Sequence, residues 1–208
     1  MTRIILVRHG ETDYNRGKVT LGRADVPLND LGMRQAKAVA GSFTRPSVAI
    51  YTSPLSRCRA TADAIALATG VAVVEDPALI EMDVGEVEHL TRDALRAQYG
   101  DFLRTWMSDD AGDARMPGGE TLREVQDRAW SAIERIAGTH ADGEIVVVTH
   151  NFVIATVVCR AIGLPLSGFR RLRHQVGSKT TIEIGERGAA LVALNDRAHL
   201  VAAGLADA

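Results

Sequence analysis

The 208-residue sequence predicts an α/β fold, a three-layer α/β/α sandwich with a mostly parallel central sheet. Short apolar runs alternate with amphipathic segments along the chain, which is typical of strands connected by helices. Two runs, residues 4–7 and 145–148, are apolar at every position, as expected for strands buried on both faces. With 46% hydrophobic residues, the chain can bury one full core. We therefore expect a single domain over residues 1–208.

The N-terminal half contains three predicted strands and two predicted helices. The strands are residues 4–7, 48–51 and 71–74. Asn29 or Asp30 is expected to cap the first helix. Ser53 is expected to cap the second helix, with Pro54 at its first position and Gly70 near its end.

The C-terminal half continues the alternation. Apolar side chains recur at helical spacing from Leu95 to Trp106. Thr121 and Glu124 have the spacing of a capping box, so a further helix should follow them. The other predicted elements are a strand at 145–148, a very apolar helix at 153–162, and a closing hairpin of residues 180–184 and 191–194.

Composition excludes several classes of function. The net charge of −2 and the 4% of aromatic residues give no support for nucleic-acid binding. The apolar run from Phe152 to Val158 is too short to span a membrane. Cys58 and Cys159 lie far apart, and no metal-ligand spacing occurs, so we expect no metal. Without a signal-peptide pattern, a reduced cytoplasmic protein is expected.

Arg8, His9 and Gly10 directly follow the first predicted strand, where open α/β sheets bind ligands. A histidine can attack phosphorus through one ring nitrogen while a hydrogen bond, typically to a backbone carbonyl, holds the other. The arginine fork matches two phosphate oxygens, and glycine lets the backbone approach closely. A lone histidine is usually structural, but this adjacency favours an anion-binding, covalent-catalytic site.

His150 stands at the end of the other fully apolar run and begins a helix whose free N–H groups would point toward an anion. Arg57 lies in the first turn of the predicted helix after Ser53. Arg59 points about 200° away around that helix, so at most one of the two arginines should face the site. Composition leaves open which one does, or whether both are solvated.

Four carboxylates, at Glu81, Asp83, Glu86 and Glu88, lie within eight residues. A leaving oxygen needs an acid to protonate it. Such a charge run is usually a solvated loop, and one carboxylate facing a phosphate pocket is the alternative. The remaining histidines, His89, His140, His174 and His199, are isolated, and we expect structural or surface roles for them. The basic segment around His174 is expected to be a solvated helix end.

The chain resembles the histidine phosphatase superfamily, in its phosphoglycerate-mutase-like branch. The matching motifs are LVRHGET at residues 6–12, SPLSRCRAT at 53–61, PGGET at 117–121 and VVVTH at 146–150. They occur in the family's order over nearly the whole chain.

The resemblance implies that His9 is the nucleophile and forms a phosphohistidine. It implies Arg8, Arg57 and His150 as the phosphate pocket, with Asn15 as a further contact, and Glu81 as the proton donor. His150 is thus expected to be both catalytic and phosphate-binding, and we add its neighbour Asn151 to the expected phosphate contacts.

Three departures from the family pattern concern the rim of the pocket. The family often has Trp-Glu-Gly where this chain has residues 87–89, Val-Glu-His. It often has Arg and Gln where this chain has Val19 and Leu21. Two glycines commonly follow the second histidine, and here they are Asn151 and Phe152. None of these removes a core catalytic residue, so the departures concern substrate choice.

We therefore expect a metal-independent phosphatase without a cofactor, acting on a small phosphorylated metabolite. A cofactor-dependent phosphoglycerate mutase is the first alternative, and a catalytically silent phosphate-binding module is the second. The balance of arginines and aspartates between residues 92 and 115 favours the phosphatase over the mutase. Phosphoserine, a sugar phosphate, a cobalamin-pathway phosphate and a broad range of esters all remain open. Family members often pair, so a homodimer is also an open expectation.

Overall fold

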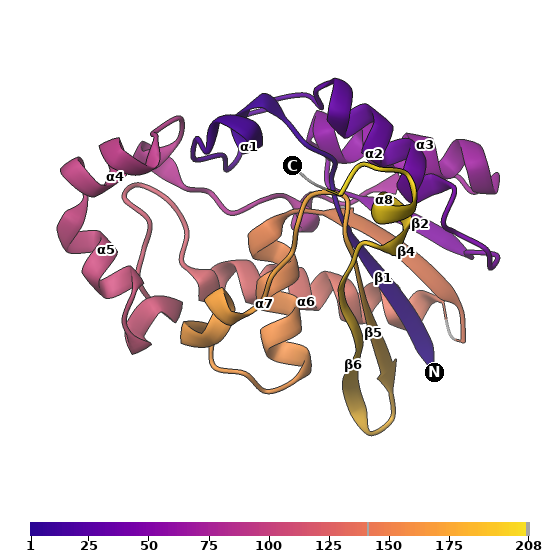
Figure 1. Cartoon of the computed structure of the whole chain (residues 1–208). Coiled ribbons are helices and arrows are strands. Elements are labelled where there is room, and N and C mark those ends of the chain that lie inside the picture. Colours follow the sequence, from indigo (N-terminus) through magenta and orange to yellow (C-terminus); the bar gives the residue numbers. More distant parts are fainter. Residues whose placement is uncertain (141, 207–208) are drawn as a thin grey trace.

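The computed structural model describes residues 1–140 and 142–206 and places one mixed sheet at the centre of the molecule (Figure 1). Its strands are β1 (Thr2–Arg8), β2 (Ala49–Thr52), β3 (Val73–Glu75), β4 (Glu144–Thr149), β5 (Lys179–Gly185) and β6 (Gly188–Asp196). They are ordered β3-β2-β4-β1-β5-β6. The first four strands run parallel, whereas β5 is antiparallel to both of its neighbours. The predicted mostly parallel sheet and the closing hairpin are confirmed.

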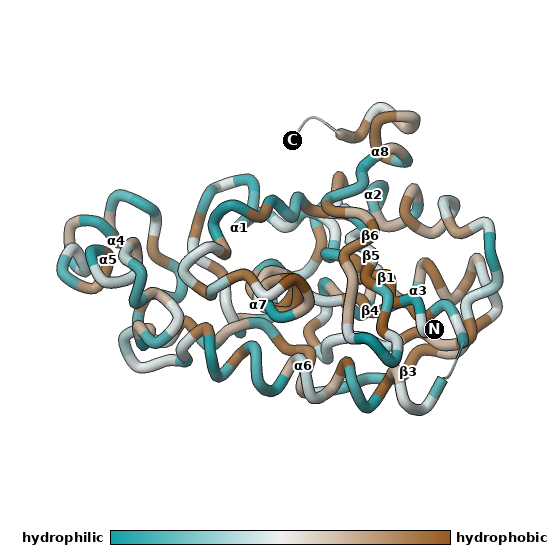
Figure 2. The backbone as a smooth tube through the Cα atoms, turned by 90° about the horizontal axis from the view of Figure 1, so that it is seen from below, coloured by the Kyte–Doolittle hydropathy of each residue, from teal (hydrophilic) through white to brown (hydrophobic). Residues whose placement is uncertain are grey.

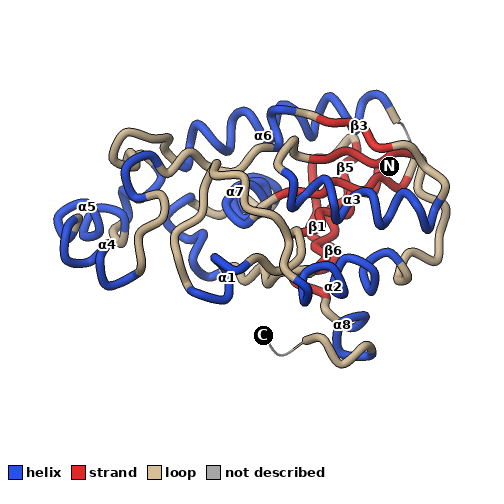
Figure 3. The backbone as a smooth tube through the Cα atoms, turned by 90° about the horizontal axis from the view of Figure 1, so that it is seen from above, coloured by secondary structure: helices blue, strands red, loops and turns tan. Residues whose placement is uncertain are grey.

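Helices cover both faces of this sheet. On one face, α2 (Asp30–Ala40) and α3 (Ser56–Thr69) pack against Ile5 and Val7. On the other, α6 (Leu122–Thr139) and α7 (Asn151–Ala161) pack against Ile4 and Leu6. Successive side chains of β1 point to opposite faces, so one strand contributes to both cores. Figure 3 shows α2 and α6 on opposite sides of the strands, as the three-layer prediction requires.

Apolar residues concentrate along the central strands and in α7, which Figure 2 shows end-on in brown. This helix buries Val153, Ile154 and Val157, and its high hydrophobicity reflects its position between α6 and the sheet. Within the residues that the structure describes, no helix is long and apolar enough to cross a bilayer.

The remaining helical elements are short. They are α1 (Asp13–Gly17), α4 (Arg92–Gln98), α5 (Gly100–Trp106), α8 (Ala198–Ala202) and the 3₁₀ segments Pro77–Leu79, Gly85–Val87, Asp109–Gly112 and Leu166–Arg171. The apolar residues that recur at helical spacing from Leu95 to Trp106 belong to two helices, α4 and α5. The helix is interrupted between them because the backbone of Tyr99 leaves the helical conformation. These two helices project at one end of the molecule (left in Figure 1).

The predicted caps are confirmed at two helices and wrong at a third. Asn29 caps α2 by accepting a hydrogen bond from the Gly32 amide, and Thr121 forms a capping box with Glu124. The helix expected to start at Pro54, with Ser53 as its cap, starts at Ser56 and has Leu55 at the cap position. The reason is that the Ser53 amide donates to the Val148 carbonyl, which extends the sheet by one residue before the chain can turn.

Gly85 provides a test of how tightly the segment after Glu81 is packed. Its φ of +56° is left-handed, and a Cβ there would collide with the carbonyl of Pro117. We expect Gly85→Ala to lower the free energy of unfolding by about 2 kcal/mol or more, because the conformational cost and the collision add. Urea unfolding measures this.

Gly70→Ala is the matched control. Gly70 has a φ of +74° but no atom within 4 Å of a built Cβ. Only the conformational cost of roughly 1 kcal/mol should appear there. Equal losses in the two variants would show that the contact with Pro117 is unimportant.

Candidate active site

The two predicted site histidines emerge side by side because β1 and β4 pair in register. Arg8 lies opposite Thr149, and the His9 amide donates to the Thr149 carbonyl at 3.1 Å. His150 directly follows β4, and the two imidazole centroids are 5.2 Å apart. Both rings are buried, with exposed fractions of 3% and 0%. Residues 141 positions apart in the sequence therefore share one site.

The hydrogen bonding of His9 identifies which ring nitrogen is available for chemistry. Nδ1 lies 2.7 Å from the Gly10 carbonyl oxygen, which can only accept, so Nδ1 carries the proton. Nε2 then holds the lone pair, and it makes no hydrogen bond to the described residues. Burial and the charges of Arg57 and Arg8 hold the pKa of His9 well below its ordinary value, which keeps the ring neutral. A neutral imidazole with an available Nε2 is a competent nucleophile.

Two guanidinium groups lie beside these rings without a carboxylate partner among the described ion pairs. Arg57 is fully buried and donates to the carbonyls of Gly22 and Ala24 at 2.7 and 2.8 Å. Arg8 is half-buried and donates to the His174 carbonyl, while its buried Nε has no hydrogen-bond partner in the described chain. Burial lowers the pKa of Arg8 to about 10 and also lowers that of Arg57. Buried cations lacking a counter-ion favour the binding of an anion.

His150 is held in a fixed tautomer by its neighbours. Arg57 Nε donates to His150 Nδ1 at 3.3 Å, so the ring proton is on Nε2, which lies 2.7 Å from the Ser53 hydroxyl oxygen. Burial and the charge of Arg57 hold the pKa of His150 well below its ordinary value. His150 is therefore neutral beside the nucleophile, and its ring N–H donates to the Ser53 hydroxyl.

Among the four clustered carboxylates, Glu81 is the one that enters the site. Its exposed fraction is 4%, and its oxygens accept from the amides of Met82 and Phe152 at 2.9 and 3.4 Å. Burial raises the pKa of Glu81, and this outweighs the opposing effect of Arg57 and Arg8. A buried carboxyl with a raised pKa suits a proton donor.

The other three carboxylates have structural partners. Asp83 caps the turn at Gly85, and Glu86 is exposed and accepts from the Tyr99 hydroxyl. Glu88 accepts from the amides of Gly22 and Ala24 at 2.6 and 3.1 Å. It thus holds the loop whose carbonyls bind Arg57.

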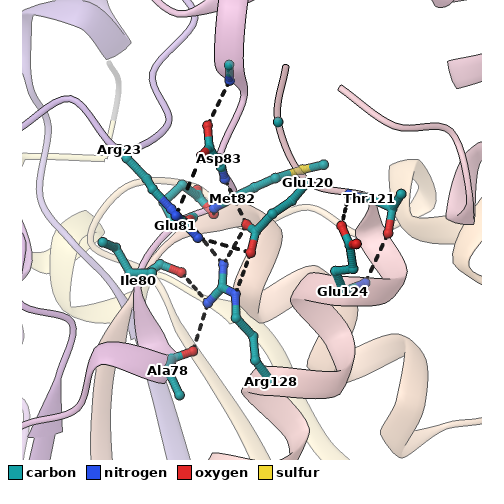
Figure 4. Close-up of polar contacts among 12 residues, drawn as sticks. Arg23, Ala78, Ile80, Glu81, Met82, Asp83, Glu120, Thr121, Glu124 and Arg128 are labelled. Carbon is teal, nitrogen blue, oxygen red and sulfur yellow. Dashed lines mark hydrogen bonds and ion pairs between the residues drawn. The ribbon is translucent and has the colours of Figure 1, made fainter. Parts of the chain in front are cut away.

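The segment that carries Glu81 is fixed by Arg128 and Glu120 (Figure 4). Arg128 donates to the carbonyls of Ala78, Ile80 and Glu81 at 2.8, 2.6 and 3.1 Å. It also pairs with Glu120 at 3.0 Å, and Glu120 accepts from the Asp83 amide at 2.8 Å. Arg23 joins this network through Glu120 and the Glu81 carbonyl. The backbone on both sides of Glu81 is therefore held in place.

Two further expected contacts lie at the margin of the site. Asn15 lines the cavity next to Arg8, but its Oδ1 serves the capping box with Thr12 at the start of α1. Asn151 is the first residue of α7, next to His150, and does not line that cavity. The structure thus leaves the amide of Asn15 better placed than Asn151 for a ligand in the cavity.

The geometry decides the choice between the two arginines of α3 and corrects one expectation. Arg59 is exposed and pairs with Asp63 and Glu75, so Arg57 alone of the two faces the site. The basic segment before His174 ends a 3₁₀ helix with Arg171 and Arg173 exposed, as expected, whereas His174 itself is buried and its carbonyl accepts from Arg8. Burial lowers the pKa of His174 to about 4.

Sequence reasoning missed Ser53, Arg128 and Glu88 as supports of the site. Ser53 belongs to the SPLSRCRAT motif but was interpreted as a helix cap. Arg128 carries no motif signal of its own, because its partners are backbone carbonyls. Within the described part of the chain, no group of three or more His, Cys, Asp or Glu side chains is arranged to hold a metal ion.

Together these residues form a small anion site with a nucleophile and an acid. The charges of Arg8 and Arg57 act on both histidines, and Arg57 Nε donates to the His150 ring beside His9. The buried carboxyl of Glu81 can hold a proton, and the charges of Arg57 and Arg8 act on its pKa. The arrangement suits transfer of a phosphoryl group, which requires positioning and charge stabilisation.

Known proteins share both this sequence pattern and this fold. A protein named "Probable phosphoglycerate mutase GpmB" from Serratia proteamaculans (strain 568) is 35% identical to this chain. The match covers 83% of this chain and 80% of that protein. The structure of Bacillus stearothermophilus YhfR has a TM-score of 0.88 and 26% identity over 96% of this chain and 100% of its own. A mycobacterial glucosyl-3-phosphoglycerate phosphatase has a TM-score of 0.84 and 28% identity over 94% and 99%, respectively.

The profile of the histidine phosphatase superfamily (branch 1) matches residues 4–197. This range contains every residue of the candidate site described above. The chain therefore belongs to the histidine phosphatase superfamily.

Proposed function

We propose that the protein is a phosphatase that hydrolyses small-molecule phosphomonoesters through a phosphohistidine at His9. The observation that carries this proposal is the unoccupied Nε2 of a buried, neutral His9 beside two guanidinium groups without a carboxylate partner. A dianionic phosphoryl group would supply the missing negative charge and present its phosphorus to the nucleophile.

The reaction proceeds in two balanced steps. In the first, the Nε2 lone pair of His9 forms a P–N bond, the P–O ester bond breaks, and the Glu81 carboxyl gives its proton to the leaving oxygen. In the second, the Glu81 carboxylate takes a proton from water, the water oxygen attacks phosphorus, and the P–N bond breaks. We expect Arg8 and Arg57 to stabilise the equatorial oxygens in both steps, and His150 to join them when its Nε2–H exchanges Ser53 for the phosphoryl group. Glu81 is restored to its acid form when inorganic phosphate leaves.

The second candidate is a phosphoglycerate mutase, which the name of the Serratia relative favours. A mutase passes the phosphoryl group to a second organic acid instead of water. The charges between α4 and α6 support hydrolysis, because Arg96 and Arg104 pair with Asp93 and Asp101 on their own helices. These exposed pairs leave little net positive charge to attract a second carboxylate. Product analysis with 3-phosphoglycerate distinguishes isomerisation from phosphate release.

Removing the nucleophile tests the mechanism directly. We expect His9→Ala to abolish the acid-labile phosphoenzyme and nearly all turnover, because no other described group at the site offers an equivalent lone pair. Rapid-quench labelling with a radioactive phosphoester measures both. His140→Ala is the control, since His140 is the C-cap of α6 and its ring bonds to Tyr51, outside the candidate site. Wild-type turnover without His9 would exclude the proposal.

Replacing the acid tests the role of Glu81. Glu81→Gln should reduce turnover of alkyl phosphates by about 10²-fold or more, the usual scale of general acid catalysis. With p-nitrophenyl phosphate the first step should be nearly unaffected, because that leaving group departs without a proton. The second step still needs a base, so phosphoenzyme should accumulate.

Glu86→Gln is the matched control, because Glu86 is exposed and its carboxylate accepts from the Tyr99 hydroxyl, away from the buried site. If Asp83→Asn showed the dependence on the leaving group and Glu81→Gln did not, the proton donor would be reassigned to Asp83. The proposed roles of His9 and the arginines would be unchanged by that result.

Chelation tests the proposed independence from metals. Since Arg8, Arg57 and His150 supply the stabilising donors, dialysis against EDTA should leave the rate of phosphate release unchanged. A loss that Mg²⁺ or Zn²⁺ restores would contradict this part of the proposal. The mycobacterial phosphatase structure is a complex with VO3, and we expect vanadate to inhibit this protein competitively as a mimic of five-coordinate phosphorus.

A further inference from the structure

A cavity of about 790 Å³ adjoins the candidate phosphate site. Arg8 and Asn15 line it, as do residues 14–20 on one side and α4 and α5 on the other. Figure 1 shows the helices that supply these lining residues, α1 and the projecting helices α4 and α5. The leaving group of an ester whose phosphoryl group contacts Arg8 would therefore extend into this cavity.

The cavity has a packed aromatic wall. Trp106 stacks on Phe102 with centroids 5.6 Å apart and meets Phe152 edge-on at 6.1 Å. Val84 and Val87 also line it, and both are buried. Aromatic side chains that pack on one another present a fixed apolar surface, which gains free energy when it is covered by an apolar group.

Exposed charged side chains also line the same cavity. Arg16 is paired with Glu11 at 3.0 Å, and Lys18 and Arg92 are exposed to solvent. Water screens exposed charges, so they contribute little to the binding of a ligand compared with a buried surface. The buried apolar residues of the lining should therefore favour ligands whose organic group is apolar and fits the cavity.

Two of the departures from the family pattern line this cavity. Val19 and Phe152 both line the cavity, so these positions carry apolar side chains where the family pattern often has arginine and glycine. We propose that the substrates of this site are phosphomonoesters of bulky apolar alcohols or phenols, in preference to small charged metabolites such as phosphoserine or 3-phosphoglycerate. This inference rests on the proposed phosphatase function.

A series of n-alkyl phosphates tests the preference without changing the chemistry, because the acidity of the leaving alcohol is nearly constant along the series. We expect kcat/KM to rise about threefold per methylene, or roughly 80-fold from ethyl to hexyl phosphate, as each methylene leaves water. Phosphoserine and 3-phosphoglycerate should react no faster than ethyl phosphate.

Two variants locate the effect in the cavity. Phe152→Ala should reduce the hexyl-to-ethyl ratio below about tenfold, because part of the apolar wall is lost. Val19→Arg should reduce the same ratio from the opposite wall without opening a hole in the core. Phe43→Ala is the matched control, since Phe43 packs against the core on the other face of the sheet and should leave the ratio unchanged.

Binding to the His9→Ala protein separates this inference from the proposed function. Calorimetry should show that His9→Ala binds hexyl phosphate more tightly than ethyl phosphate or phosphoserine. If it does while the wild-type protein forms no phosphoenzyme with any ester, the proposed function fails and the apolar preference stands. Equal affinities along the alkyl series, or faster turnover of 3-phosphoglycerate than of hexyl phosphate, would overturn the inference.

Discussion

Strands β1 and β4 pair in parallel with Arg8 opposite Thr149, and this register positions the whole candidate site. A shift by one residue would turn every side chain of a strand to the other face and separate the two histidines. The fully apolar sequences of both strands oppose such a shift, because helices cover them on both sides. The same packing that builds the core thus brings His9 and His150 within 5.2 Å of each other.

Burying the positive charges of Arg57 and Arg8 costs free energy, and hydrogen bonds to neutral backbone carbonyls offset this cost. Carbonyls of Gly22 and Ala24 accept hydrogen bonds from Arg57, and the His174 carbonyl accepts one from Arg8. Carbonyl dipoles satisfy the donors but leave the net charge in place, so the attraction for a phosphoryl dianion is retained. Burial also keeps both histidines neutral, which the reaction requires of a nucleophile.

The acid depends on a separate support. Arg128 and Glu120 bind the backbone around Glu81, and Glu88 binds the loop that binds Arg57. Residue 88 keeps the Glu of the family's Trp-Glu-Gly pattern, whereas His89 occupies the glycine position with a φ of +67°. His89 Nδ1 also lies 3.0 Å from the hydroxyl oxygen of Tyr14 in α1. This hydrogen bond links the rim of the cavity to α1. The departures in this segment therefore alter the rim and leave the supports of the site intact.

The sequence by itself determined the parallel sheet and the identity of His9, Arg8 and His150 as a group, because buried parallel strands are uniformly apolar and a polar motif at their ends stands out. It also predicted the capping box at Thr121 and a cap at Asn29 or Asp30, because these features depend on neighbouring residues alone. The tertiary structure decided which of Arg57 and Arg59 faces the site, which carboxylate is buried, and that α3 starts at Ser56. Those outcomes depend on contacts with distant segments, such as the bond from Ser53 to Val148 and the binding of the Glu81 segment by Arg128, which no local pattern encodes.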